Sequence, residues 1–363
     1  MNASSASASS DARRTAAGDR AQHLGERVLV CGVNWIGDTV MSMPALQAYR
    51  KANPSARITL LVKPGLLPLW KLHAAPDQLL TLEGGWSGTL RTVRALRTEK
   101  FARAFVLPHS FRSALVPWLA RIPLRIGMPG HWRDAMLTQV IRPRDVPGRR
   151  HQAYEYLDLM VPDAAQADLE LPQIKVPEAA EAAARERLAA VPAPRVGVIP
   201  GAARGPSKQW PAEHFAELGR LLAGQRGCGL VVLGITREAD LCGDIARRIG
   251  PAAVNLAGRT SLPEWIALLR ACDLIVANDS GGMHLAAAVG TPVVALYGIT
   301  DPAKTGPIGR ICRVLQNSEV RARDISRDSP AARKSLASIH PEQVYRAALD
   351  CLEQSHRATG KQG

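Results

Sequence analysis

The sequence has few aromatic residues and few lysines. Only 4% of its 363 residues are Phe, Trp or Tyr, so the flat side chains on which nucleic-acid bases stack are scarce. Nine of the 46 basic residues are Lys, and this excess of Arg favours bidentate contacts with phosphate or carboxylate groups. The formal net charge of +14 therefore predicts an acidic partner, but not primarily a nucleic acid.

The sequence also lacks closely spaced cysteine motifs and long apolar runs. The six cysteines form no C-x-x-C pair, which favours a reducing compartment and argues against a zinc site. The longest apolar stretch, Leu285–Ile299, is about 15 residues long and contains Gly290 and Pro292. It is shorter than the ~18–20 residues that cross a bilayer. Residues 1–25 are rich in Ser and Ala without the apolar segment of a signal peptide, so we expect a disordered tail on a cytoplasmic protein.

Short β-branched runs alternate with helical stretches from Arg27 onward, a rhythm typical of a parallel sheet covered by helices. Strands are predicted at 28–33, 57–62 and 103–108, and then at 195–200, 229–234, 253–258, 273–278 and 292–298. Helices are predicted at 38–52, 87–99, 178–190 and about 341–355. Because an acidic stretch at 151–194 separates the two series, we predict an α/β protein of two Rossmann-like domains facing across a cleft.

The predicted organisation has five segments. They are a disordered tail (1–25), a first Rossmann-like domain (26–175), a linker with a helix (176–194), a second Rossmann-like domain (195–340) and a C-terminal helix and tail (341–363). Residues 26–150 carry +12 of the net charge, so the first domain is expected to meet the acidic partner. The sequence leaves open which domain the last helix packs against.

The segment NWIGD (34–38) follows the first predicted strand. Ligands of open parallel sheets bind beyond the carboxyl ends of the strands, and Gly37 permits a tight turn there. Asp38 is therefore a candidate general base facing the cleft, with an ordinary helix cap as the alternative. Its spacing alone favours the cap.

The segment PGAARGPSKQWP (200–211) follows the first strand of the second domain. It does not match G-x-x-x-x-G-K-[ST], which argues against a nucleoside triphosphatase. Its glycines and Lys208 can bring backbone N–H groups and an ammonium to a phosphate. A surface loop with a solvated lysine remains an equal alternative.

The segment NDSGGMH (278–284) joins a predicted strand to a helix. A helix N-terminus at Ser280, Gly281 and Gly282 would attract a phosphate. His284 could add a donor or be structural. The negative charge of Asp279 suits hydrogen bonds from sugar hydroxyls better than contact with a phosphate, and helix capping is its alternative role.

These three segments, with LPHSFRSALVP (107–117), resemble in order the motifs of the family 9 glycosyltransferases of GT-B fold. Within that family they are most similar to the lipopolysaccharide heptosyltransferase II type, over residues 28 to about 300. The sequence departs from the pattern at His109, where Asn is expected, and at Ala203 and Arg204, where an acidic and an aromatic residue are expected. The resemblance implies inverting transfer of L-glycero-D-manno-heptose from ADP-heptose to the first heptose of the lipid A-linked inner core.

The resemblance also implies roles for individual residues. Asp38 would be the catalytic base, and Lys208 would contact the pyrophosphate and assist catalysis. The remaining donor-binding residues would be Glu238 at the adenosine ribose, Asp279 at the heptose, and Ser280, Gly281, Gly282 and His284 at the phosphates. Candidates for acceptor recognition are Arg112, Arg121, Arg125 and Arg133, each of which could instead lie on a solvated face. Neither a metal ion nor another cofactor is expected.

The expected setting is a monomer in peripheral contact with the anionic cytoplasmic face of the inner membrane. Heptosyltransferase I or another family 9 core glycosyltransferase remains an alternative. So does a sugar-nucleotide epimerase on the same scaffold, which would need no acceptor. A basic nucleic-acid-binding protein is the third alternative, although the sequence has no helix-turn-helix, zinc-finger or RNP signature.

Overall fold

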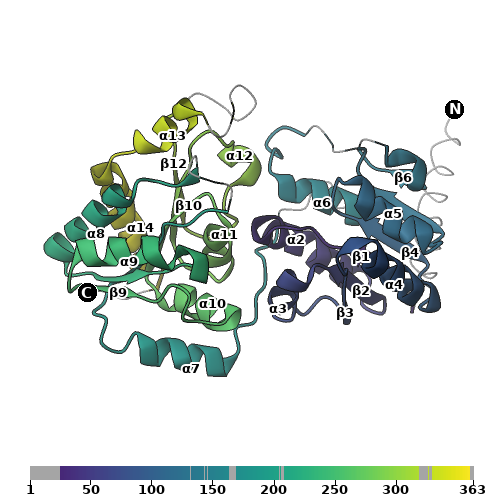
Figure 1. Ribbon diagram of the computed structural model, residues 1–363, viewed down its shortest axis with the longest axis horizontal. Helices are drawn as coiled ribbons and strands as arrows, with labels where there is room; N and C mark the ends of the chain where they lie inside the picture. Colours follow the sequence, from purple (N-terminus) through teal and green to yellow (C-terminus); the bar gives the residue numbers. More distant parts are fainter. Residues whose placement is uncertain are drawn as a thin grey trace, which may run out of the picture. The chain divides into compact units, whose positions relative to one another are not determined.

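The structure is a computed structural model that describes residues 25–130, 132–142, 144, 146–162, 169–203, 205, 208–318, 326 and 329–359. Its strands form two six-stranded parallel sheets flanked by helices (Figure 1). The chain divides into two compact units. The first comprises Met1–Asn34, Pro44–Asp145 and Ala153–Asp168, and the second comprises Trp35–Met43, Val146–Gln152 and Leu169–Gly363.

The first sheet has the strand order β3-β2-β1-β4-β5-β6. Its strands are β1 (Arg27–Cys31), β2 (Arg57–Val62), β3 (Gln78–Thr81), β4 (Arg103–Val106), β5 (Leu124–Gly127) and β6 (Gln139–Val140). All neighbours pair in parallel. This is the Rossmann order, and its direction reverses between β1 and β4, where open sheets bind ligands.

Helices connect these strands. They are α2 (Ile36–Ala52), α3 (Leu67–Trp70), α4 (Gly85–Thr98), α5 (Phe111–Leu119) and α6 (Gln152–Met160), with short 3-10 turns at Pro64–Leu66 and Asp134–Met136. Apolar strand residues such as Leu29 and Val106 are buried against α4 and α5 residues such as Val93 and Ala114. Burial of apolar surface on the sheet is the main source of stability here.

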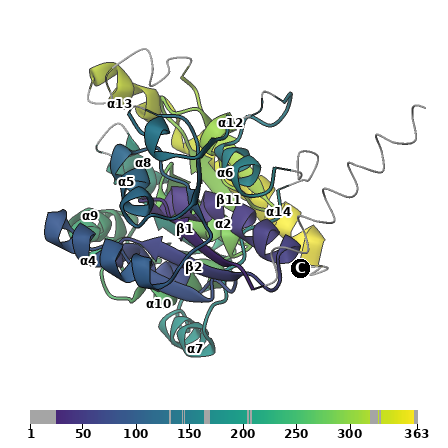
Figure 2. The same ribbon diagram turned by 90° about the vertical axis from the view of Figure 1, so that its right-hand side faces the viewer.

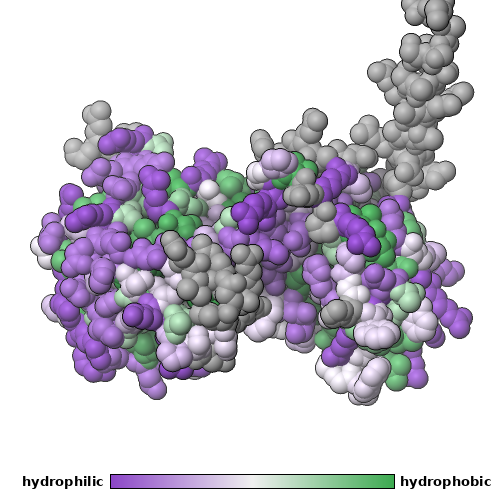
Figure 3. Space-filling view, turned by 90° about the horizontal axis from the view of Figure 1, so that it is seen from above, coloured by the Kyte–Doolittle hydropathy of each residue, from purple (hydrophilic) through white to green (hydrophobic). Residues whose placement is uncertain are grey.

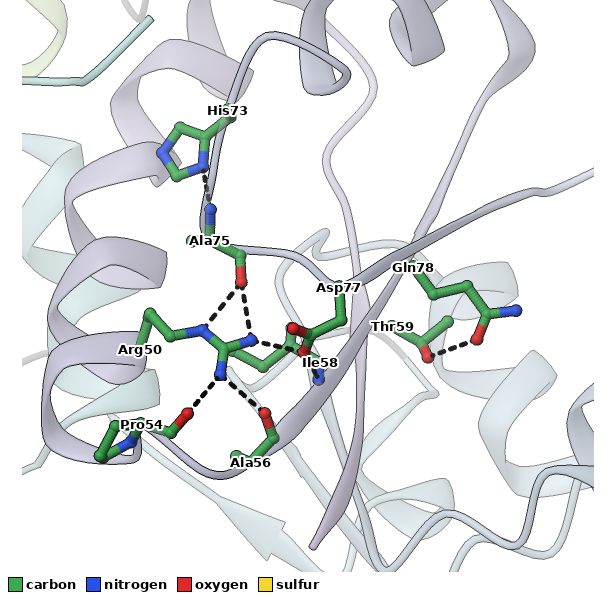
Figure 4. Close-up of polar contacts among 9 residues, drawn as sticks. All are labelled: Arg50, Pro54, Ala56, Ile58, Thr59, His73, Ala75, Asp77 and Gln78. Carbon is green, nitrogen blue, oxygen red and sulfur yellow. Dashed lines mark hydrogen bonds and ion pairs between the residues drawn. The ribbon is translucent and has the colours of Figure 1, made fainter. Parts of the chain in front are cut away.

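Arg50, near the end of α2, ties the edge of the first sheet together (Figure 4). Its guanidinium donates hydrogen bonds to the carbonyls of Pro54, Ala56 and Ala75 and pairs with Asp77 at 2.5 Å. The Asp77 carboxylate also accepts the backbone N–H at the second residue of β2, at 2.7 Å. One arginine thus supplies donors to three carbonyls in two connections, the one between α2 and β2 and the one between α3 and β3.

The second sheet repeats the same order, β12-β11-β10-β7-β8-β9. Its strands are β7 (Arg195–Ile199), β8 (Gly229–Val232), β9 (Ala253–Asn255), β10 (Leu274–Asn278), β11 (Val293–Leu296) and β12 (Cys312–Leu315). Its helices are α7 (Glu178–Arg187), α8 (Ala212–Arg226), α9 (Ala239–Ile249), α10 (Leu262–Ala271), α11 (Gly281–Ala288), α12 (Pro302–Thr305), α13 (Pro330–Ala337) and α14 (Pro341–Thr359). The reversal of direction lies between β7 and β10.

Two peripheral helices of the second unit have defined neighbours. Helix α14 packs on α8 and on the strands β10 to β12, which answers the question that the sequence left open. Helix α7 lies beside α10 in both Figure 1 and Figure 2, and Arg270 donates to Glu181 at 2.8 Å between them. Both helices therefore belong to the second unit rather than to a separate linker or tail.

Fold class and strand order agree with the two Rossmann-like domains predicted, but the boundaries differ. The first unit ends at residue 168 rather than 175, and residues 35–43 and 146–152 belong to the second unit. Residues 1–24 of the predicted tail lie outside the described residues. None of the described helices is long and apolar enough to cross a membrane, and hydrophilic side chains predominate on the face drawn in Figure 3.

Candidate active site

Two of the predicted motifs meet where the second sheet reverses direction. Strands β7 and β10 are hydrogen-bonded neighbours, so the loops that follow them leave the sheet side by side. Asn278 joins these loops: its Nδ2 donates to the carbonyl of Pro200 at 2.8 Å, and its Oδ1 accepts the N–H of Trp210 at 3.0 Å. The buried amide thereby fixes both ends of the loop that carries Lys208.

A cavity of about 500 Å³ lies in the second unit, at the carboxyl ends of these strands. It is lined by six of the residues predicted for the site, Asp38, Lys208, Asp279, Ser280, Gly281 and His284, together with residues of the loop from Thr300 to Thr305. The structure therefore brings the candidate base and most of the predicted donor-binding residues together in one cavity.

Lys208 and Asp279 are bound to each other. The ammonium lies 2.5 Å from Oδ2 of Asp279, and both side chains are largely buried. Thr300 donates its hydroxyl to the same oxygen at 2.6 Å. The aspartate thus holds the lysine in a fixed position and balances its charge within the cavity.

The first turn of α2 packs closely on the first turn of α11. A Cβ at Gly37 would lie 2.9 Å from Cδ2 of His284, and one at Gly281 would lie 2.8 Å from Cβ of Ile36. Glycine at both positions is therefore required by this close approach. Asp38 is the third residue of α2 and lies inside the first turn, rather than preceding the helix as a cap.

Two polar atoms at the start of α11 have no hydrogen-bond partner among the described residues. One is the hydroxyl of Ser280, which occupies the N-cap position but makes no capping bond, and the other is Nδ1 of His284. Burial lowers the pKa of His284 to about 4, so its imidazole is neutral at pH 7. Buried polar atoms without partners are costly, so this helix end is a candidate ligand site.

A second cavity, of about 280 Å³, adjoins the first through Ser280 and Gly281, which line both. It is lined by Glu238, whose carboxylate accepts the N–H of Ile235 at 3.0 Å, and by Trp265, whose indole N–H is buried without a partner among the described residues. The remaining predicted donor-binding residues, Glu238 and Gly282, are therefore located in this smaller cavity.

The first unit has its own cavity, of about 430 Å³, at the carboxyl ends of β1, β2 and β4. It is lined by Lys63, Ser110, Arg112 and Asn34 among others. The Nη2 of Arg112 donates to the hydroxyl of Thr89 at 2.8 Å, which fixes the guanidinium at the rim of the cavity. Position and charge suit this cavity to an anionic group.

The other three arginines predicted for acceptor recognition lie elsewhere. Arg121 follows α5, in a surface hollow with Arg97 and Lys100. Arg125 donates to the carbonyls of Ile122, Pro123 and Met136, and Arg133 is fully buried, where it donates to the carbonyls of Val106 and Pro108. Burial lowers the pKa of Arg133. Of the four candidates, the structure places only Arg112 at the cavity of the first unit, and acceptor recognition by the four stays a prediction.

The structure also locates two of the residues that depart from the family pattern. His109 lies with its Nε2 3.8 Å from Oε2 of Glu155 in the first unit. Ala203 lines both cavities of the second unit, and Arg204 lies outside the described residues. The small Ala203 side chain leaves space where a larger acidic residue was expected.

Sequence reasoning missed the loop after β11. Thr300 binds Asp279, and Tyr297 anchors the loop by donating its hydroxyl to the carbonyl of Thr305 at 2.5 Å. Gln316 also donates to the carbonyl of Thr300 at 2.8 Å. The position of the loop, directly after the strand that pairs with β10, is the signal that could have identified it.

Within the described ranges, no three His, Cys, Asp or Glu side chains cluster in a way that could hold a metal ion.

Comparison with known proteins gives a consistent result. Residues 89–334 match glycosyltransferase family 9 (heptosyltransferase). The chain is 32% identical to lipopolysaccharide heptosyltransferase 2 of Salmonella typhimurium, covering 93% of this chain and 99% of that protein. It is 31% identical to the Escherichia coli K12 protein of the same name, covering 88% and 96%. The solved structure of E. coli ADP-heptose LPS heptosyltransferase II superposes with a TM-score of 0.76 at 30% identity, covering 91% of this chain and 99% of that one. The chain therefore belongs to glycosyltransferase family 9, the heptosyltransferases.

Proposed function

We propose that this glycosyltransferase transfers L-glycero-D-manno-heptose from ADP-heptose to the first heptose of the lipopolysaccharide inner core, with inversion at the anomeric carbon. The names of the relatives that are 31–32% identical over most of the chain support this member of the family. The observation that carries the donor assignment is the pair of adjoining cavities that share the start of α11. No observation favours an epimerase or a nucleic-acid-binding protein.

In the proposed orientation, the donor extends from the smaller cavity into the larger one. The adenosine would occupy the smaller cavity, with its ribose hydroxyls at Glu238 and its base near Trp265. The pyrophosphate would bridge the cavities at the start of α11, where free N–H groups, the Ser280 hydroxyl and the neutral imidazole of His284 can donate. The heptose would then lie in the larger cavity beside Asp279 and Asp38.

Asp38 would act as the general base. Its carboxylate takes the proton of the attacking acceptor hydroxyl as the new bond to the anomeric carbon forms. At the same time the bond from that carbon to the β-phosphate oxygen breaks on the opposite face, and ADP carries away the electron pair. General-base assistance of this kind contributes about 10²–10⁴-fold in rate.

Lys208 and the start of α11 would stabilise the departing ADP. The ammonium donates one hydrogen bond to Asp279, and its other protons can meet the phosphate oxygens, whose charge grows as the bond breaks. Among the described residues, the hydrogen bonds to the Asp279 carboxylate both go to Oδ2, which leaves Oδ1 for a heptose hydroxyl. These groups supply the positive charge of the site, so the proposal needs no cation.

The acceptor would bind through the first unit. Lys63 and Arg112 at its cavity suit the phosphates and keto-acid carboxylates of an inner-core glycolipid. The concentration of positive charge in residues 26–150 is consistent with this partner. We infer a monomer that meets its lipid-linked acceptor at the cytoplasmic face of the inner membrane.

The test is ADP release from ADP-heptose with core acceptors that bear no heptose, one heptose or two. The proposal expects turnover chiefly with the acceptor that bears one. Preference for the heptose-free acceptor would indicate heptosyltransferase I activity instead, and conversion of ADP-heptose without any acceptor would indicate an epimerase. Salt-sensitive DNA binding without donor binding would contradict the whole assignment.

A further inference from the structure

Large apolar side chains remain exposed on two neighbouring helices of the first unit. Trp86 and Leu90 of α4 are 72% and 48% exposed, and Phe111 and Trp118 of α5 are 49% and 46% exposed. Spacings of four and seven residues place each pair on one face of its helix. We call these four residues the α4–α5 surface. Clustered exposed apolar residues of this size mark an interaction site.

Hydrogen bonds at both ends hold α4 and α5 side by side. Near their N-termini, Arg112 of α5 donates to the Thr89 hydroxyl of α4 at 2.8 Å. Near their C-termini, Arg97 of α4 donates through Nε and Nη2 to the carbonyl of Leu119 at 3.1 and 2.8 Å. Figure 2 shows both helices on the side of the unit that faces the viewer. The two apolar pairs therefore belong to one surface.

Positive charge surrounds this surface. The exposed basic residues of the two helices and of the turns that follow them are Arg91, Arg94, Arg97, Lys100, Arg112 and Arg121. Of the neighbouring acidic residues, Glu99 pairs with Arg27, and Glu83 pairs with Arg91 and balances its charge. The net positive charge of the rim therefore comes from the other five basic residues. Such a cationic rim repels a second copy of the same face and attracts an anionic partner.

We propose that the α4–α5 surface docks on an anionic lipid bilayer. Trp, Phe and Leu side chains enter the region between headgroups and acyl chains, while arginines contact lipid phosphates with their guanidinium groups. Each cationic residue held near such a membrane contributes about fivefold to the partition constant.

The cavity of the first unit opens at the same end of this helix pair. It is lined by Gly84, which precedes α4, and by Ser110 and Arg112 at the start of α5. A protein docked through the α4–α5 surface would therefore present this cavity near the headgroups. This link to a lipid-anchored acceptor rests on the proposed function, whereas the docking itself does not.

The experiment is cosedimentation of the full chain with vesicles of phosphatidylglycerol and phosphatidylcholine, and with vesicles of phosphatidylcholine alone. We expect wild-type protein to bind the anionic vesicles and to be released by high salt. Changing Trp86, Leu90, Phe111 and Trp118 together to Ser should lower binding at least tenfold. Arg94→Glu, on the solvent face of α4, should lower it about fivefold or more without touching the apolar residues.

Two matched changes in the second unit serve as controls. Leu171→Ser alters an exposed leucine, and Arg346→Glu reverses an exposed arginine of α14, and both should bind vesicles as wild type does. Circular dichroism establishes that each variant is folded. If the fourfold variant does not fold, the comparison of vesicle binding between Arg94→Glu and Arg346→Glu tests the proposal.

Several results would overturn the proposal. The first is that wild-type protein does not bind anionic vesicles, and the second is that the α4–α5 variants bind them as well as wild type does. The third is that wild-type protein self-associates and that the variants abolish this self-association while they still bind vesicles. Turnover separates the two proposals. The variants should keep wild-type activity on a deacylated, water-soluble acceptor and lose activity on the corresponding acylated acceptor in a bilayer. If no acceptor is used at all, the proposed function fails while vesicle binding still tests the surface.

Discussion

The ammonium of Lys208 lies 2.5 Å from the carboxylate of Asp279, so two residues predicted to bind different parts of the donor also bind each other. The pair comes from loops after β7 and β10, which are adjacent only because the strand order reverses there. The aspartate fixes the lysine before the donor arrives, and preorganised charge of this kind stabilises a transition state without further rearrangement.

Lys208→Ala should lower turnover about 10²–10³-fold, because a charge aimed at the departing phosphate is lost. Among the described residues it also leaves the Asp279 carboxylate with the Thr300 hydroxyl as its one hydrogen-bond partner, so affinity for ADP should fall as well. Steady-state kinetics and calorimetry with ADP measure the two effects. Lys304→Ala, at the same cavity but on α12, serves as the comparison and should cost less. Unchanged kinetics in Lys208→Ala would remove the lysine from the mechanism.

Asp38→Asn should separate catalysis from donor binding. The amide keeps the shape of the side chain in the first turn of α2 but cannot accept the acceptor's proton, so kcat should fall about 10²–10⁴-fold. Affinity for ADP should stay close to that of wild type, since the proposed ADP contacts lie on the loops of the second sheet. Near-wild-type turnover by a folded Asn variant would exclude the general base.

Gly37→Ala tests the close packing of α2 on α11. The added Cβ would lie 2.9 Å from Cδ2 and 3.1 Å from Nε2 of the buried His284, and overpacking of this kind costs about 1–3 kcal/mol. Donor binding should weaken too, because His284 would have to move. Gly224→Ala is the control: its Cβ meets nothing within 4 Å inside α8, so it should stabilise the protein by about 0.5–1 kcal/mol. Denaturant unfolding compares the two, and equal stabilities would contradict the packing.

Metal removal provides a direct test of the chemistry. If Lys208 and the start of α11 supply the positive charge that the departing ADP requires, then EDTA should leave initial rates within about twofold of those measured without it. Full loss of activity in EDTA, restored by a divalent cation, would show that the site takes up a metal with its substrate.

The sequence was sufficient to predict the two Rossmann-like sheets, because buried parallel strands appear as near-continuous apolar runs, as in 58–62 and 293–296. It was less informative where strands are short and half exposed, as in β5 and β12. Local sequence also could not separate a buried from an exposed arginine. Arg133 became structural because carbonyls of Val106 and Pro108 surround it, and these partners lie 25 or more residues away.

The candidate site, like the fold, could be predicted from the sequence only in part. Motifs identified many of the residues that line the two cavities of the second unit, since glycines at helix starts and polar residues at strand ends have local signatures. Partners such as Thr300 have no such signature, because their role depends on strand pairing between β10 and β11. Tertiary pairing, rather than composition, therefore decides which polar residues complete the site.

Acid should destabilise the protein through His73, which lies near Arg50 in Figure 4. Burial lowers its pKa to about 4, and its Nδ1 accepts the N–H of Ala75 at 3.1 Å while Nε2 lies 3.2 Å from Oε1 of Gln47. A proton on Nδ1 would therefore face another N–H. Because an unfolded histidine titrates near 6.5, the unfolded chain binds the extra proton between about pH 6.5 and 4.

The stability from neutral His73 is thus complete above about pH 6.5 and is lost as pH falls toward 4, by an amount on the order of 3 kcal/mol. His73→Asn keeps an acceptor near the position of Nδ1 but cannot titrate. Urea unfolding at a series of pH values should show a smaller decline in unfolding free energy for this variant. The buried His284, whose pKa is also lowered to about 4, should account for part of the decline that remains. An identical pH dependence in wild type and His73→Asn would show that His73 has the same pKa in the folded and unfolded states, which would contradict the prediction.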